Sequence, residues 1–196
     1  MKAAILGDSQ GDGLERVLGP VLARHGYELV SGWTEAGASL AALLEHAGAI
    51  GEADLVLVVS GGGNDSNVEA HADDYRAKLD RVVAELRAAG ARDVIWVGPM
   101  RSDDPRVSGL HDAARAIQGR GIRGARWIDG YTLSITAQHA PDGVHFTRNG
   151  YSSLAVELER AIWGQGIATA IGLVGTLAFL ASVGVIVLEA MEARGT

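Results

Sequence analysis

DLVLVVS, residues 54–60, is the most strand-like segment of the chain, because apolar and β-branched side chains follow one another without interruption. Strands that are buried on both faces of a parallel sheet have this continuous apolar pattern. Four further apolar runs occur at Lys2–Leu6, Tyr27–Ser31, Asp93–Gly98 and Ala125–Asp129. Together these segments predict a sheet of five parallel strands.

Stretches with the spacing of amphipathic helices separate and follow the predicted strands. They are Leu14–His25, Ser39–Ala49, Ala70–Ala89, Ser108–Arg120 and Ser152–Trp163. Because parallel strands joined by helices cross over with right-handed topology, this alternation predicts an open three-layer α/β/α sandwich with a flavodoxin-like five-stranded sheet. In such folds the ligand site lies beyond the carboxyl ends of the strands.

The C-terminal part of the chain differs in composition from the predicted main domain, residues 1–163. Gly164-Gln165-Gly166 (164–166) marks a short hinge, and residues 167–188 then run without a charge. At about 1.5 Å of rise per residue, this stretch matches a hydrocarbon core of roughly 30 Å. We therefore expect a transmembrane hydrophobic helix followed by a short polar tail, residues 189–196. The alternative for an all-round apolar helix is burial in a homo-oligomeric or phage-virion-like assembly.

Residues that flank the apolar stretch indicate an orientation in the membrane. Arg160 and Trp163 precede the stretch, whereas Glu189, Glu192 and only Arg194 follow it. An excess of basic residues is typical of the cytoplasmic side, so this bias predicts a cytoplasmic main domain.

The composition argues against several functional classes. The formal net charge is -7 and Lys and Arg do not cluster, so no nucleic-acid partner is expected. No cysteine is present, which excludes disulfides, zinc–thiolate sites and thiol nucleophiles. His25, His46, His71 and His111 lack metal-ligand spacing and are expected on solvated surfaces. The glycine run 61–63 lacks the Lys-Ser/Thr of a phosphate-binding loop, and we predict neither a metal nor a cofactor.

A serine stands where the first predicted strand turns into a helix, in Gly7-Asp8-Ser9-Gln10-Gly11-Asp12-Gly13. The free N–H groups and the dipole of a helix N-terminus stabilise negative charge that develops near such a hydroxyl. A nucleophilic serine also needs a histidine to accept its proton and a carboxylate to orient that histidine. His145 follows Asp142 in Pro141-Asp142-Gly143-Val144-His145-Phe146, so one loop would supply both groups. His139 is the only rival, and no carboxylate precedes it at a comparable offset.

Further hydrogen-bond donors follow the second and third predicted strands. Ser60-Gly61-Gly62-Gly63-Asn64-Asp65 places an asparagine amide, a neutral donor, after glycines that allow close backbone approach. Gly37 lies at the start of a predicted helix, where its backbone N–H is free to donate.

These motifs resemble, in order, the four blocks of the SGNH (GDSL-like) hydrolases: GDS, a glycine, GxND and DxxH. The resemblance covers roughly residues 1–163. It implies that Ser9 is the nucleophile and the first oxyanion donor, with His145 as general base and Asp142 as its partner. The Gly37 N–H and the Asn64 side chain would be the other oxyanion donors.

The second block has two candidate glycines. Gly32 competes with Gly37, because Ser31-Gly32-Trp33 can also be read as the second block. We favour Gly37, which stands before the helix-like segment Ser39–Leu44. Asp8 and Asp65 are expected to be structural.

The resemblance implies a serine ester hydrolase. Because the chain lacks long insertions between the blocks, we expect a shallow, open site for short acyl esters, such as O-acetyl groups on a glycan or a lipid-linked sugar. The alternative is a non-catalytic structural or binding protein with the same fold, anchored in a membrane or a virion-like assembly by residues 167–188.

Overall fold

The computed structural model describes residues 1–30, 32–59 and 62–164. The chain divides into two compact units, Met1–Leu158 and Glu159–Thr196. The strands are β1 (Lys2–Gly7), β2 (Glu28–Leu29), β3 (Trp33–Thr34), β4 (Leu55–Val59), β5 (Asp93–Val97) and β6 (Arg126–Ile128). The helices are α1 (Ser9–Arg24), α2 (Leu40–Ala47), α3 (Ala72–Ala88), α4 (Pro105–Gln118), α5 (Gly130–Leu133), α6 (Arg148–Glu159) and the π-helical turn η1 (Arg160–Gly164).

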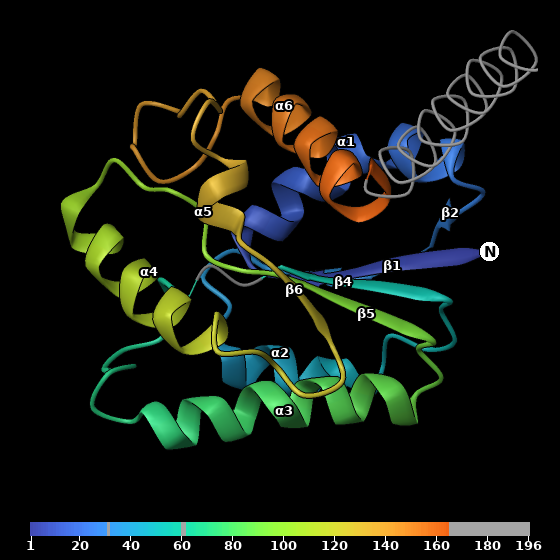
Figure 1. Ribbon diagram of the computed structural model, residues 1–196, viewed down its shortest axis with the longest axis horizontal. Coiled ribbons are helices and arrows are strands. Elements are labelled where there is room, and N and C mark those ends of the chain that lie inside the picture. Colours follow the sequence, from blue (N-terminus) through green and yellow to red (C-terminus); the bar gives the residue numbers. More distant parts are fainter. Residues whose placement is uncertain (31, 60–61, 165–196) are drawn as a thin grey trace, which may run out of the picture. The chain divides into compact units, whose positions relative to one another are not determined.

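The sheet is parallel, with the order β2-β1-β4-β5-β6 and with β3 also paired to β1 (Figure 1). The prediction of five strands was wrong in one respect, since the second strand is split into β2 and β3 and the sheet has six strands. Gly32 lies in this interruption and packs so closely on β1 that an added Cβ would lie 2.0 Å from the carbonyl oxygen of Ile5. With β2 and β3 counted as one interrupted strand, the order is the flavodoxin-like 2-1-3-4-5.

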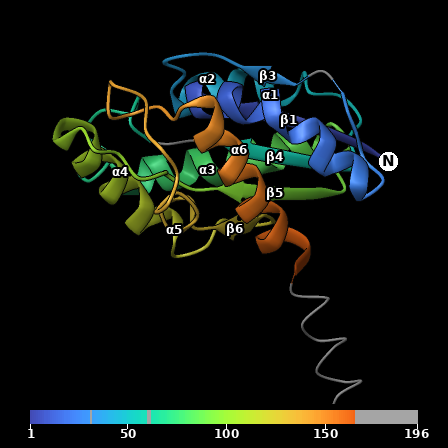
Figure 2. The ribbon, with the colours of Figure 1, turned by 90° about the horizontal axis from the view of Figure 1, so that it is seen from above.

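Helices cover both faces of the sheet in the unit Met1–Leu158. In Figure 1 and Figure 2, α1 and α6 lie on one face, and α2, α3 and α4 lie on the other. Every residue of β4 is buried, as its continuous apolar sequence predicts. Alternate strand residues pack into the core under α2, α3 and α4, including Leu6, Val58 and Trp96. The three-layer arrangement places the loops that follow β1, β4 and β6 at one edge of the sheet.

Several helices begin earlier than their apolar patterns predict. Helix α1 begins at Ser9 because the Asp8 side chain accepts a hydrogen bond from the Gln10 N–H at 3.0 Å and caps the helix. Helix α4 begins at Pro105, where Asp104 caps in the same way. Helix α6 begins at Arg148, and the short α5 was not predicted. First turns held by polar caps lack the apolar spacing that marks the rest of a helix.

The predictions for the C-terminal segment lie mostly outside the described residues. The apolar helix expected at 167–188 and the polar tail at 189–196 are outside them, as is the hinge beyond Gly164. Among the helices that the structure describes, none is long and apolar enough to cross a membrane.

Candidate active site

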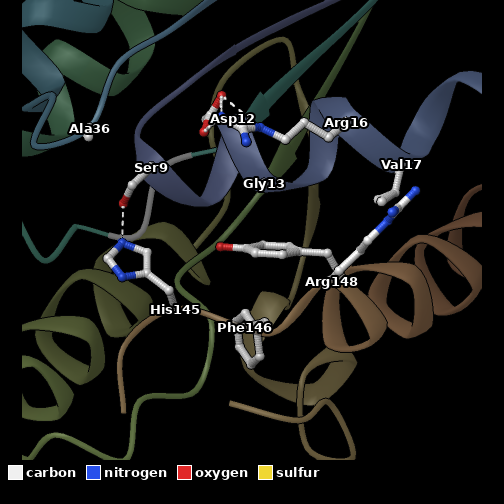
Figure 3. A pocket seen from close by; sticks show the side chains of 10 residues that line it. Ser9, Asp12, Gly13, Arg16, Val17, Ala36, His145, Phe146 and Arg148 are labelled. Atoms are coloured by element: carbon white, nitrogen blue, oxygen red, sulfur yellow. Dashed lines mark hydrogen bonds and ion pairs between the residues drawn. The ribbon is translucent and has the colours of Figure 1, made fainter. Parts of the chain in front are cut away.

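The side chains of Ser9, His145 and Asp142 form a continuous hydrogen-bonded chain. Figure 3 shows the part of this chain that joins Ser9 to His145. His145 Nε2 lies 2.9 Å from Ser9 Oγ, and His145 Nδ1 lies 2.6 Å from Asp142 Oδ2. Ser9 is the first residue of α1, whereas the other two belong to the loop before α6, more than a hundred residues later in the chain. The fold therefore brings together a hydroxyl, an imidazole and a carboxylate that the sequence singled out separately.

Asp142 holds the loop and the imidazole at the same time. Its Oδ1 accepts hydrogen bonds from the backbone N–H groups of Val144 and His145, both at 2.9 Å, which leaves Oδ2 for the imidazole. The hydrogen bond with the His145 side chain lowers the pKa of Asp142 most. The two backbone N–H groups lower it further, so that this pKa falls to about 2. The carboxylate is therefore ionised near neutral pH and favours the imidazole tautomer with hydrogen on Nδ1. That tautomer leaves Nε2 able to accept a proton from Ser9.

Ser9 stands at a helix N-terminus with its backbone N–H unused by the helix. The first residue of a helix has no intrahelical acceptor for its N–H, so this donor is available to an oxygen beside Ser9 Oγ. Asp8 is buried, and its N–H donates to Val59 O at 3.1 Å. The buried Asp8 thus ties the end of β1 to β4 and caps α1.

Gly37 lies in a tight turn that precedes α2. The Ala38 N–H donates to Glu35 O at 3.1 Å, and Gly37 has φ +81°, which together define a type II turn. The turn leaves the Gly37 N–H unused, and an added Cβ would meet no atom within 4 Å. Gly37 thus has an open position, whereas Gly32 is packed against Ile5.

Asn64 and Asp65 join the loop after β4 to the turn that contains Gly37. Asn64 Nδ2 donates to Ala38 O at 3.1 Å, which uses one of its two N–H groups. Both carboxylate oxygens of Asp65 accept from the Leu40 N–H at 3.1 Å, at the start of α2. Burial raises the pKa of Asp65, and the backbone hydrogen bond opposes this shift. Asp65 has the structural place that the sequence predicted for it.

Ser9 and His145 line two cavities of different size. The smaller, of about 170 Å³, also contains Gly37 and Asn64 in its wall. The larger, of about 590 Å³, extends between α1 and α6 and has Arg16 and Arg148 in its wall. The site therefore offers one small compartment with hydrogen-bond donors and one larger compartment with cationic side chains.

His139, the rival of His145, has a different partner. Its Nδ1 lies 2.9 Å from Asp103 Oδ2, its Nε2 lies 3.0 Å from Arg101 O, and its ring stacks on Phe146. The carboxylate beside His139 comes from a distant loop, which sequence spacing does not reveal. The polar contacts of the His139 ring within residues 62–164 therefore join the loop before α6 to the loop after β5 and leave Ser9 to His145.

The expectation that His111 lies on a solvated surface was wrong. The imidazole is buried on α4, and its Nδ1 donates to Met100 O at 2.7 Å. Its position in the helix, three residues before the buried Ala114 and seven before the buried Gln118, is the signal that could have predicted burial. The ring also lines the smaller cavity.

Gln10 is a further residue that the sequence did not single out. Its side chain is buried beside Ser9, where Nε2 donates to Val144 O at 2.8 Å and Oε1 accepts from the Tyr151 hydroxyl at 2.9 Å. Gln10 thereby connects α1 to the loop of His145 and to α6.

Among residues 1–30, 32–59 and 62–164, no three His, Asp or Glu side chains gather as a metal site would require.

The comparisons with known proteins identify one family. A sequence profile described as the GDSL-like Lipase/Acylhydrolase family matches residues 4–152. None of the curated proteins matches the chain significantly.

Several solved structures share the fold. The chain is similar to a lipase/acylhydrolase from Enterococcus faecalis, with 19% identity and a TM-score of 0.63 over 84% of this chain and 96% of that one. It is similar to TesA, with 18% identity and a TM-score of 0.63 over 84% and 99% of the two chains. It is also similar to the psychrotrophic esterase EstA from Pseudoalteromonas sp., in a structure inhibited by monoethylphosphonate, with 16% identity and a TM-score of 0.58 over 82% and 96%.

Proposed function

The chain belongs to the GDSL-like lipase/acylhydrolase family, and on that basis we propose that it is a serine hydrolase of short acyl esters that uses Ser9, His145 and Asp142. The observation that carries this proposal is the unbroken hydrogen-bonded chain from Ser9 Oγ through the imidazole to the Asp142 carboxylate. A serine hydroxyl becomes nucleophilic only when a positioned base can take its proton, and this arrangement supplies that base.

The proposed reaction has two similar halves. Ser9 Oγ attacks the acyl carbon while its proton moves to His145 Nε2, and the carbonyl oxygen becomes an oxyanion. Collapse of this intermediate expels the alcohol, which takes the proton from His145, and leaves an acyl group on Ser9. Water then attacks the acyl-enzyme in the same way, and the acid is released with Ser9 restored.

Three donors would stabilise the oxyanion in this proposal. The Ser9 N–H lies at the start of α1, the Gly37 N–H is unused by its turn, and Asn64 has one amide N–H beyond the one bound to Ala38 O. Donors of this kind, fixed in advance, stabilise charge in the transition state without reorganisation.

The sizes of the two cavities support the preference for short acyl groups. The compartment of about 170 Å³ that contains Gly37 and Asn64 has room for an acetyl group or a slightly longer one. The larger compartment, of about 590 Å³, would then receive the alcohol part of the ester. An O-acetylated glycan or lipid-linked sugar has this combination of a small acyl group and a bulky alcohol.

A fluorophosphonate probe tests the nucleophile directly. Such reagents phosphonylate activated serines, and the structure of EstA inhibited by monoethylphosphonate motivates the choice. We expect labelling of Ser9, no labelling of Ser9→Ala, and a fall in p-nitrophenyl acetate hydrolysis of about 10³-fold or more in that variant. A folded protein that is neither labelled nor active would instead support the structural or binding role. p-Nitrophenyl esters of increasing chain length then define the acyl preference, which we expect to fall beyond short chains.

Membrane attachment through residues 167–188 and a cytoplasmic catalytic domain stay proposals that rest on the sequence alone. Partition of the full chain into detergent micelles would support membrane attachment. Recovery of the chain in a large particle would support the virion-like alternative.

A further inference from the structure

Arg148 is a cation without a partner in the larger cavity of the site. It is the first residue of α6, its side chain is exposed, and its guanidinium has no hydrogen-bond or ion-pair partner among the residues that the structure describes. Figure 3 shows this side chain running from α6 toward Val17 of α1, in the same cavity wall as Ser9 and His145.

The other arginine of the cavity is already neutralised. Arg16 Nη2 donates to both carboxylate oxygens of Asp12, at 2.8 and 3.1 Å, one helical turn away on α1. Two guanidinium groups and one carboxylate leave one unbalanced positive charge in the cavity wall, on a chain whose formal net charge is -7. Arg148 is therefore the group available to a ligand.

The wall also contains apolar side chains, which offer a surface for the body of a substrate. Val17, Phe146 and Tyr151 contribute to it, and the Tyr151 ring packs on Gly13 so closely that an added Cβ there would lie 2.1 Å from the ring. A ligand that fits this cavity combines an apolar body beside Ser9 with an anionic group at its edge.

We infer that Arg148 selects ester substrates whose alcohol part has an anionic group, a carboxylate or a phosphate. This inference rests on the proposed function, because it assigns the small cavity to the acyl group and the large one to the alcohol. A guanidinium binds either anion through two parallel N–H···O hydrogen bonds, which a neutral alcohol cannot form. The anion lies away from the reacting carbonyl, so the contact is the same in the bound substrate and in the transition state.

Three acetyl esters test the inference in the full chain: para-acetoxybenzoate, para-acetoxyphenyl phosphate and the neutral methyl para-acetoxybenzoate. We expect Arg148→Gln to raise KM for at least one of the two anionic esters by about three- to tenfold, with kcat nearly unchanged, because an exposed ion pair is lost. KM for the neutral ester should change less than about twofold, and the effect on the anionic esters should shrink in high salt. The ester with the larger increase identifies carboxylate or phosphate as the preferred group.

Matched variants separate charge from structure. Arg81→Gln removes one positive charge from α3, on the opposite face of the sheet, and should leave all three KM values unchanged. Arg148→Lys keeps the charge but cannot form the two parallel hydrogen bonds, so it should restore only part of the lost preference. An equal rise in KM for the neutral ester, or no rise for either anion, would overturn the inference.

A binding measurement distinguishes this inference from the proposed function. In the Ser9→Ala protein, which cannot form an acyl-enzyme, we expect para-hydroxyphenyl phosphate or para-hydroxybenzoate to bind more tightly than phenol, and Arg148→Gln to remove the difference. Binding that depends on Arg148 in the Ser9→Ala protein, together with no esterase activity of the wild-type chain, would overturn the proposed function alone. Equal binding of anion and phenol in an active esterase would overturn the Arg148 inference alone.

Discussion

The Gln10 side chain donates a hydrogen bond to the Val144 carbonyl at 2.8 Å, although 134 residues separate them in the chain. Val144 immediately precedes His145, and Gln10 immediately follows Ser9. This bond therefore joins the two segments that must keep the serine hydroxyl and the imidazole within hydrogen-bond distance.

Replacement of Gln10 by Leu should lower kcat by about tenfold and the free energy of unfolding by about 1–3 kcal/mol, because the loop loses its tether and buried polar groups lose their partner. Burial raises the pKa of Tyr151 to about 12, so its hydroxyl is protonated and donates to Gln10 Oε1. Tyr151→Phe removes that bond and the contact of the hydroxyl with the Phe146 backbone, but it keeps the bond to Val144 and should cost less activity than Gln10→Leu. Steady-state kinetics and denaturant unfolding of both variants check the order. Equal losses in kcat would contradict a positioning role for the bond to Val144.

Asn64→Ala should reduce kcat by about 10²-fold or more with little change in KM, because the lost donor would act mainly on the transition-state oxyanion. The control is Asp65→Asn, in the same loop, which keeps an oxygen able to accept from the Leu40 N–H. We expect that control to alter thermal stability and to leave kcat within about threefold. If kcat fell equally in both variants, the effect would come from the loop and not from the Asn64 amide.

Gly37→Ala and Gly32→Ala distinguish the two glycines considered for the second block. Gly37→Ala places a side chain at φ +81° in open space, so we expect a folded protein that is about 1–2 kcal/mol less stable, with reduced kcat as the turn relaxes. Gly32→Ala forces a Cβ against Ile5 O and should prevent stable folding. Soluble expression, circular dichroism and esterase assays check both. Full activity in Gly37→Ala would argue against a catalytic role for the Gly37 N–H.

The sequence predicts most of the fold because the information needed is local. Continuous apolar runs identify buried strands, and the carboxyl ends of parallel strands meet at one edge, so Ser9, Asn64 and His145 could be expected near one another. The same reasoning supplies Asp142, since it lies in the same loop as His145.

Long-range packing accounts for what the sequence does not predict. The split between β2 and β3 depends on the approach of Gly32 to the backbone of Ile5, which no periodicity encodes. The role of Gln10 depends on a partner on a distant loop, and the free guanidinium of Arg148 depends on which carboxylates lie near it in space. Such features are properties of the folded chain and need coordinates.

The low pKa of Asp142 predicts the shape of the pH–rate profile. The hydrogen bonds from His145 and Val144 lower this pKa from 3.8 to about 2. The Asp142 carboxylate is therefore negatively charged at every pH above 3.8 and loses its charge only as pH falls toward 2. Above about pH 4 the Asp142 carboxylate should therefore add nothing to the pH dependence of log kcat/KM, and the acid limb of the profile should have a slope no greater than one before it levels off. Assays across this range check the slope. A slope of two would mean that the carboxylate titrates together with the base.

His111 predicts how stability changes with pH. Burial lowers the pKa of this imidazole below its ordinary 6.5, against the opposing hydrogen bond with Met100 O. In the unfolded chain the group binds a proton below about pH 6.5, whereas in the folded chain it stays neutral to lower pH. The free energy of unfolding should then fall on acidification from about pH 7 to 5, because the unfolded state binds more protons.

His111→Asn is the matched variant for this test, because its amide nitrogen can take the place of Nδ1 and donate to Met100 O, yet it does not titrate. We expect the variant to be less stable at pH 7, since the shorter side chain leaves a cavity, but to lose less stability on acidification than the wild type. Urea unfolding at several pH values gives both slopes. If the two proteins lost stability in parallel, the acid sensitivity would belong to other groups, and the buried imidazole would have to be charged in the folded state.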